Sequence, residues 1–157
     1  MKTKHIIIGI SFLLLIYIVV FIFSTVVEKN NKITNLNKLR FSYTTGYSLN
    51  SYVVYEINNI NGKYIVKVKP SSKEESKEYE VSKEKVDKVM NTLDKYNIYT
   101  WNGFRKVDKN VLDGNSFCLN IEYGNNKKIE ASGYMRWPKN YSEIKKYLDK
   151  ELGSLYK

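Results

Sequence analysis

The longest apolar segment of the chain covers residues 5–27, which are 23 residues without a formal charge. In residues 6–27, seventeen of twenty-two positions are Ile, Leu, Val or Phe. As a helix with a rise of about 1.5 Å per residue, this run is about 33 Å long and matches a hydrocarbon core of roughly 30 Å. The pattern predicts an uncleaved signal anchor, residues 1–27, that crosses the bilayer as a transmembrane helix through residues 5–27.

A cleaved signal peptide is the main alternative, because Lys2 and Lys4 resemble its charged n-region. Against it, the apolar run exceeds the usual h-region of about 7 to 15 residues, and the nearest cleavage candidate, at Ser24, has a bulky Ile22 two positions before it. A lipoprotein signal needs a cysteine after the run, whereas the sole cysteine is Cys118. A secreted domain with a cleaved signal stays as the second interpretation, and a buried helix of a soluble core as the third.

Basic residues flank the apolar run on both sides, so they do not by themselves determine which end of the helix faces the cytoplasm. Lys2 and Lys4 precede it, and four basic residues lie between positions 29 and 40. That count favours a C-terminal flank inside the cell. However, a short tail before a long apolar run is how bacterial export signals begin, and large domains translocate largely regardless of charge. We therefore expect a single-pass protein of the cell membrane with its C-terminal domain outside the cytoplasm.

Residues 28–37 are polar and aperiodic, as in a juxtamembrane linker, and residues 38–157 are expected to form one extracytoplasmic domain. Alternation of apolar and polar positions predicts its strands. The predicted strands are residues 39–44, 52–57, 63–69, 117–123 and 127–132. Asn61 and Gly62 supply the positive φ angles of a hairpin turn. The charged residues 71–78 are expected to form a loop.

Helical periodicity follows each of the two predicted hairpins. A first helix is expected between Ser82, its N-cap, and Asn97. A second is expected between Asn140, whose capping box is completed by Glu143, and Gly153. The expected buried faces comprise Val86, Val89, Met90 and Leu93 in the first helix, and Tyr141, Ile144, Tyr147, Leu148 and Leu152 in the second. The element order predicts an α+β fold: an N-terminal transmembrane helix, then a two-layer domain with an antiparallel sheet of about five strands and two helices packed on one face.

The formal net charge of +10 arises from 26 basic residues, mostly lysines, scattered among 16 acids. A nucleic-acid interface usually gathers such charge on one face and uses arginine for forked contacts, so no nucleic acid is expected as a partner. A lysine-rich solvated surface accounts for the charge, and attraction to anionic headgroups or wall polymers is compatible with it. The heavy use of Lys, Asn, Ile and Tyr is the bias that AT-rich codons produce and indicates a low-GC bacterium.

Residue types for most catalytic and metal sites are missing from the predicted domain. His5, the sole histidine, lies in the apolar segment, which excludes a Ser-His-Asp or Cys-His arrangement and the usual zinc ligands. No glycine-rich phosphate loop occurs, so no cofactor, metal or catalytic residue is predicted and the protein is not expected to be an enzyme. Glu122 and Glu130, on two strands of one hairpin, keep open the alternative of a carboxylate-dependent hydrolase of cell-wall glycans. Cys118 is expected to be a small buried residue.

Aromatic residues gather in two connections and form the best candidate site. The candidate binding residues are Tyr99, Trp101, Phe104, Tyr134 and Trp137. Rings with polar tips suit a sugar or a peptide ligand, but they equally suit the end of a small core. Trp101 follows the apolar stripe of the first helix and is expected in the core. Trp137, beside Pro138 and charged neighbours, is the better candidate for exposure.

Three segments of the C-terminal half resemble a pattern in small bacterial membrane-anchored or lipoprotein-like domains of unknown function. They are Trp101-Asn102-Gly103-Phe104, Val111-Leu112-Asp113-Gly114 and residues 133–141. The resemblance implies an exported domain and assigns no activity or site residue. Together with the anchor it favours a single-pass membrane protein that presents a small non-enzymatic binding domain at the cell envelope. The expected partners are the lipid bilayer, through residues 5–27, and an envelope protein or an anionic wall polymer.

Overall fold

The computed structural model describes residues 13–22, 32–44 and 52–156, and it divides into two compact units, Met1–Lys32 and Ile33–Lys157. In the first unit, residues 13–22 are helical, and their apolar side chains are between 44% and 71% exposed. Within the described part of the chain, no helix has both the length and the apolar character that crossing a bilayer requires. The rest of the predicted transmembrane segment, residues 5–12 and 23–27, lies outside the described residues.

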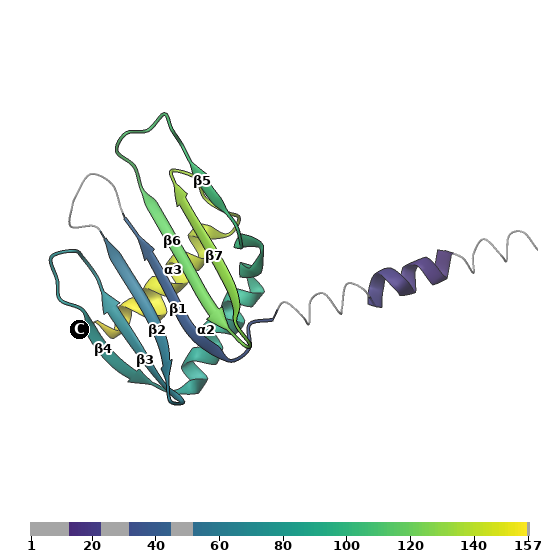
Figure 1. Cartoon of the computed structure of the whole chain (residues 1–157), viewed down its shortest axis with the longest axis horizontal. Coiled ribbons are helices and arrows are strands. Elements are labelled where there is room, and N and C mark those ends of the chain that lie inside the picture. Colours follow the sequence, from purple (N-terminus) through teal and green to yellow (C-terminus); the bar gives the residue numbers. More distant parts are fainter. Residues whose placement is uncertain (1–12, 23–31, 45–51, 157) are drawn as a thin grey trace, which may run out of the picture. The chain divides into compact units, whose positions relative to one another are not determined.

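The second unit is an α+β domain with a seven-stranded sheet in the order β4-β3-β2-β1-β6-β7-β5 (Figure 1). The strands are β1 (Leu36–Tyr43), β2 (Val53–Ile60), β3 (Lys63–Lys69), β4 (Lys77–Val81), β5 (Arg105–Val107), β6 (Ser116–Tyr123) and β7 (Lys127–Tyr134). The helices are α2 (Lys83–Lys95) and α3 (Tyr141–Glu151), with 3-10 turns η1 (Ile98–Trp101) and η2 (Gly153–Leu155). Because β5 pairs parallel with β7 while the other pairs are antiparallel, the sheet is mixed. The prediction of a purely antiparallel sheet of about five strands is therefore wrong.

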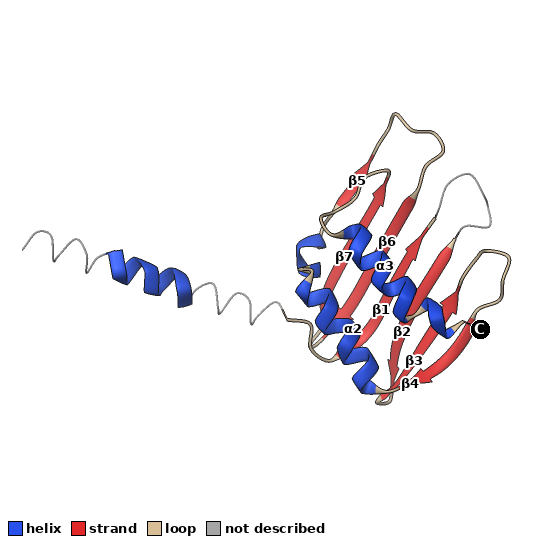
Figure 2. Cartoon of the chain, turned by 180° about the vertical axis from the view of Figure 1, so that it is seen from behind, coloured by secondary structure: helices blue, strands red, loops and turns tan. Residues whose placement is uncertain are grey.

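Apolar positions of neighbouring strands meet on one face of the sheet, and both helices cover that face (Figure 2). Leu39 of β1 lies opposite Ile57 and Ile121, and Phe41 lies opposite Tyr55. A one-residue slip would turn each of these side chains to the other face, so the alternation fixes the register. The α+β class and the packing of two helices on one face are confirmed.

The two edge strands, β4 and β5, are the elements that the sequence pattern missed. β4 begins within the predicted loop 71–78 because Tyr79 and Val81 extend the core beside Val66 and Tyr64. All three residues of β5 are exposed, so no alternation of apolar and polar residues marks this strand. Backbone pairing with β7, rather than burial of side chains, places it in the sheet.

The predicted helix ends are correct for α2 and wrong in part for α3. The hydroxyl oxygen of Ser82 accepts a hydrogen bond from the Lys85 N–H at 3.2 Å, and Asn97 follows α2 in the left-handed conformation with φ 56°. Asn140 also has a positive φ, 62°, and its side chain makes no capping bond. Its Nδ2 instead donates to the Tyr96 carbonyl at 3.2 Å, which ties the start of α3 to the end of α2.

The opposite face of the sheet is mainly polar. Arg40 and Glu56 form an ion pair across β1 and β2 on this face. Cys118 of β6 also lies here and is exposed, so the prediction that it is buried is wrong. Its neighbours Phe117 and Leu119 point into the core, and the period of two turns Cys118 outward.

A carboxylate beneath α3 ties this helix to the sheet. One oxygen of Asp149 accepts hydrogen bonds from the hydroxyls of Tyr43 and Tyr55, at 2.7 and 3.0 Å. The other oxygen accepts from the Lys145 ammonium at 2.7 Å, and that ammonium also lies 4.1 Å from the centre of the Tyr43 ring. Burial and the Asp149 carboxylate raise the pKa of both tyrosine hydroxyls well above their ordinary value, because both effects disfavour a phenolate.

These raised pKa values predict that the domain loses stability in alkali. Unfolded tyrosines ionise near pH 10, so the stabilisation is complete below about pH 10 and declines as the pH rises toward the folded pKa. Each such tyrosine should lower the free energy of unfolding by up to about 1.4 kcal/mol per pH unit in that range. Urea unfolding of the chain between pH 8 and 11 measures this slope, and Tyr43→Phe should reduce it. A midpoint that is constant over this range in the wild type would contradict the prediction.

Candidate functional site

The segment Trp101-Asn102-Gly103-Phe104 turns the chain from η1 into the edge strand β5. The Asn102 side-chain oxygen accepts from the Glu130 N–H at 3.1 Å, and the Gly103 N–H donates to the Glu130 carbonyl at 2.9 Å. Gly103 has φ +78°, a conformation that residues with a Cβ rarely adopt. The Ser132 N–H then donates to the Phe104 carbonyl at 2.8 Å, which aligns the next residues with β7. The turn therefore fixes where β5 lies.

Trp101 anchors the connection between β7 and α3. Its side chain is fully buried, and its indole N–H donates to the Lys139 carbonyl at 2.9 Å. The indole lies edge-on to the Phe117 ring at 5.7 Å and stacks on the Tyr141 ring at 6.0 Å. One side chain thus contacts the sheet, the start of α3 and the backbone before α3, as expected of a core residue.

A row of stacked rings leads from this core to the surface. Trp137 stacks on Tyr141 with ring centres 4.5 Å apart and planes 25° apart. Its side chain is 38% exposed, so the expected difference between the two tryptophans is confirmed. Gly133 permits this arrangement, because an added Cβ would overlap the Arg136 carbonyl oxygen and the Phe117 ring.

Trp137 and Phe104 form the aromatic part of a surface groove beside β5, which we call the β5 groove. Its volume is about 590 Å³, and its lining residues are Phe104, Arg105, Lys106, Val107, Arg136 and Trp137. The cations are held in place: Arg105 pairs with Glu130 and Arg136 pairs with Asp108, both at 2.9 Å. The Lys106 ammonium lies 5.4 Å from the centre of the Phe104 ring. The groove combines flat apolar rings with positive charge, which suits a ligand that has apolar or sugar surfaces and acidic groups.

The structure separates the five predicted aromatic residues into different roles. Trp137 and Phe104 line the β5 groove, and Trp101 supports it from the core. Tyr134 is half-buried, and its hydroxyl donates to the Leu112 carbonyl at 2.7 Å, which holds the loop between β5 and β6. Tyr99 is half-buried and packs against the core outside the groove.

Sequence reasoning missed the charged and aliphatic part of the groove. Arg105, Lys106 and Val107 enter it only because β5 joins the sheet, and β5 carries no apolar pattern. Arg136 is one of the charged neighbours of Trp137, and the sequence gives it no further role. The signal that was available is Asn102-Gly103, a turn pair that brings the chain back along β7.

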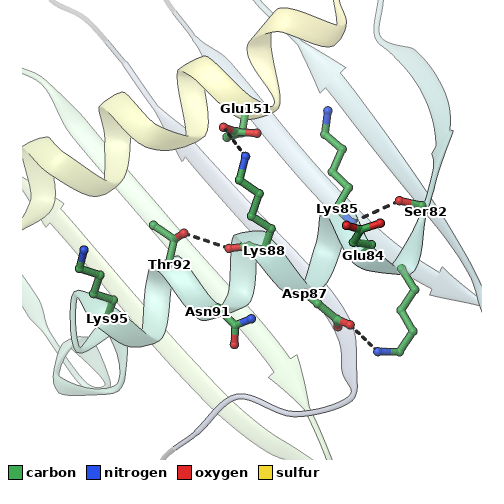
Figure 3. Close-up of a pocket in the computed structure, with 10 residues that line it drawn as sticks. Ser82, Glu84, Lys85, Asp87, Lys88, Asn91, Thr92, Lys95 and Glu151 are labelled. Atoms are coloured by element: carbon green, nitrogen blue, oxygen red, sulfur yellow. Dashed lines mark hydrogen bonds and ion pairs between the residues drawn. The ribbon is translucent and has the colours of Figure 1, made fainter.

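A larger hollow of about 850 Å³ lies along the outer side of α2 (Figure 3). Its side chains are polar and pair with one another: Lys83 with Asp87 at 2.6 Å, and Lys88 with Glu151 of α3 at 3.3 Å. The Thr92 hydroxyl donates to the Lys88 carbonyl at 2.9 Å. These are the contacts of a solvated helix surface, and none of the lining residues is aromatic. The β5 groove is therefore the stronger candidate.

The two carboxylates of the hydrolase alternative share the polar face of the sheet. Glu122 lies opposite Lys128 and Glu130 lies opposite Asn120, so the acids are diagonal neighbours on β6 and β7. Glu122 pairs with Lys128 at 3.5 Å, and Glu130 pairs with Arg105 at 2.9 Å. Both carboxylates are thus already paired with a basic side chain. Among the described residues, no group of three or more His, Cys, Asp or Glu side chains is placed to hold a metal ion.

Comparison with known proteins gives no family for this chain. No model of a protein family matches it, and no curated protein matches it significantly. The resemblance of residues 101–104, 111–114 and 133–141 to membrane-anchored domains therefore gains no support from relatives. The candidate site depends on its own geometry.

The two tryptophans should differ in their contribution to stability. Trp101→Ala removes a fully buried ring and leaves the Lys139 carbonyl without its donor, so the free energy of unfolding should fall by about 3 to 5 kcal/mol. Trp137→Ala removes a stacked, partly exposed ring and should cost about 1 kcal/mol. Urea unfolding of residues 33–157 measures both variants, since every residue of the core cluster belongs to this unit. Equal losses would place Trp137 in the core and remove it from the candidate site.

Proposed function

We propose that the protein is a single-pass membrane protein that presents a small non-enzymatic binding domain at the cell envelope, with the β5 groove as its ligand site. Residues 5–27 anchor it in the bilayer, and the C-terminal domain lies outside the cytoplasm. The observation that carries the proposal is the β5 groove itself, in which Trp137 and Phe104 stand beside three basic side chains.

The apolar character of residues 13–22 supports the anchor. All ten side chains of this helical segment are apolar or tyrosine, and each is at least 44% exposed. Apolar surface of this extent is unfavourable in water, at about 25 cal/mol per Å². Lipid tails would cover it, and the charge-free residues on both sides extend the same run to a length that matches a bilayer.

The position of the groove within the domain suits a tethered binding protein. The domain begins at Ile33, three residues before the start of β1 at Leu36. Leu36 pairs with Tyr123, the last residue of β6. At the other end of the sheet, Tyr134, the last residue of β7, lies opposite Ser116, the first residue of β6 (Figure 1). Trp137 follows three residues after Tyr134. A strand of eight residues separates these ends by about 25 Å. The groove is thus remote from the point where the chain enters the domain.

Binding is favoured over the hydrolase alternative by the surroundings of the acids. Glu122 and Glu130 each pair with a basic side chain on the polar face of the sheet, and neither acid lines the β5 groove. A glycosidase places its two carboxylates on either side of a bound sugar ring. In this domain the rings that would hold a sugar, Phe104 and Trp137, line the groove at the β5 edge.

The anchor predicts membrane retention and an external C-terminus. In a bacterial host, the full chain should stay in the membrane fraction after alkaline carbonate extraction, and a reporter that is active only outside the cytoplasm should be active when fused after Lys157. The double variant Leu14→Lys and Val19→Lys should release the protein, because each central lysine costs about 2.5 to 3.5 kcal/mol of insertion free energy. The control variant Leu14→Ile and Val19→Ile should remain in the membrane. An inactive reporter on a membrane-bound chain would reverse the proposed orientation.

The groove predicts that Trp137 is needed for retention on envelope material. Sedimentation of residues 33–157 with isolated cell envelopes should give an affinity that falls at least about tenfold in Trp137→Ala, the effect of losing an aromatic anchor from an interface. Tyr147→Ala is the matched control, since Tyr147 is a half-buried aromatic residue of α3 outside the groove. Equal retention of the wild type and Trp137→Ala would reject the β5 groove as the site.

A further inference from the structure

The backbone of β5 presents hydrogen-bonding groups at the outer edge of the sheet. In a parallel pair, alternate residues of a strand bond the same neighbour. Phe104 accepts from Ser132 and Asp108 donates to Tyr134, so the residues that bond β7 are Phe104, Lys106 and Asp108. The peptide groups of Arg105 and Val107 therefore point away from β7, on the side where the strand order ends.

An exposed apolar side chain, Val107, lies on this edge and is one difference from the other edge of the sheet. Val107 is 64% exposed, and Leu112, in the loop after β5, is 94% exposed. At the opposite edge, β4 carries Lys77, Glu78 and Glu80, charges that discourage pairing with another strand. There the Lys77 ammonium lies 4.5 Å from the centre of the Tyr156 ring, and the Tyr156 hydroxyl donates to the Glu75 carbonyl at 3.1 Å. Both edge strands are therefore charged, but Tyr156 contacts the β4 edge, whereas the β5 edge adjoins the aromatic groove.

The charges around β5 indicate an acidic occupant. The residues concerned are the bases Arg105, Lys106, Lys109, Arg136 and Lys139 and the acids Asp108, Asp113 and Glu130, five against three. Side chains alternate along β5, so Arg105 and Val107 border one face of an added strand while Lys106, Phe104 and Trp137 border the other. An added strand would therefore meet both a cation and an apolar surface on each of its faces.

We propose that β5 binds an extended acidic segment of another protein, which pairs with the outward peptide groups of Arg105 and Val107 and places apolar side chains against Trp137 and Val107. This inference rests on the proposed function of the β5 groove and names its ligand class. Main-chain pairing gives such a complex its geometry, and side-chain contacts beside the edge give it specificity. With only two outward residues in β5, the rings of the groove contribute a large share of the affinity.

Val107→Pro tests the main-chain pairing directly. Proline removes the outward N–H of Val107, while the hydrogen bonds of Lys106 and Asp108 to β7 are unaffected, and sheets tolerate proline at such edge positions. The matched control, Val107→Ala, removes the apolar side chain and keeps the N–H. The probe is a fluorescent ten-residue peptide of alternating Glu and Val, and its anisotropy is measured with the full chain in lipid nanodiscs.

We expect the wild type to bind this peptide, Val107→Pro to weaken binding at least tenfold, and Val107→Ala to weaken it less than threefold. Trp137→Ala should weaken it at least tenfold. A peptide with N-methyl groups on alternate amides tests the same bonds from the ligand side, should Val107→Pro fail to fold. Equal binding of the methylated and unmethylated peptides would overturn the proposal.

Hyaluronan, an anionic glycan, is the second probe. Its binding distinguishes a failure of strand addition from a failure of the β5 groove as a binding site. Binding of hyaluronan that depends on Trp137 and is equal in Val107→Pro and Val107→Ala, without binding of the peptide, would overturn strand addition and retain the groove as a binding site. Absence of peptide binding together with equal envelope retention of the wild type and Trp137→Ala would overturn both. Dimerisation that Val107→Pro abolishes, without peptide binding, would replace the acidic segment by a second copy of this chain.

Discussion

The burial of Trp101 is the contact on which the candidate site depends. Its ring packs against Phe117 of the sheet and Tyr141 of α3, and its indole N–H holds the Lys139 carbonyl. A buried indole N–H without an acceptor is costly, so the backbone before α3 must pass at this point. Trp101 is also the first residue of the turn that leads into β5. Trp101 therefore sets both sides of the β5 groove, although it does not line it.

Asp149 supplies the second constraint, because it fixes α3 on the sheet at the helix's other end. Two tyrosine hydroxyls and one ammonium surround its carboxylate, and a Cβ added at Gly153 would lie 2.9 Å from the Tyr55 hydroxyl. Tyr141 lies two helical turns before Asp149 on the same helix. A shift of α3 would thus disturb the stacking of Tyr141 with Trp137, so a polar contact in one part of the helix layer positions an aromatic surface in another.

The sequence predicts the centre of this fold and fails at its edges. Leu39, Phe41, Leu119 and Ile121 alternate because a central strand has one buried face, and alternation is what sequence reasoning detects. Arg105 and Lys106 have no buried face, and hydrogen bonds to β7 alone make them a strand. The capping box at Asn140 failed for a related reason: its side chain satisfies the distant Tyr96 carbonyl, a requirement that no local pattern reveals. Of the groove residues, only the two aromatic ones could be anticipated.

The property that hides β5 from prediction is also what suits it to binding. A central strand uses its peptide groups on both sides, whereas β5 uses those on one side and remains rigidly placed by bonds from Gly103, Phe104 and Asp108 to β7. Rigid placement lowers the entropy that a ligand must offset on binding. The exposed Val107 contributes nothing to the core, so folding alone does not require an apolar side chain at this position. Val107 lines the groove together with Trp137, and a partner that covers this edge of the sheet would bury its side chain.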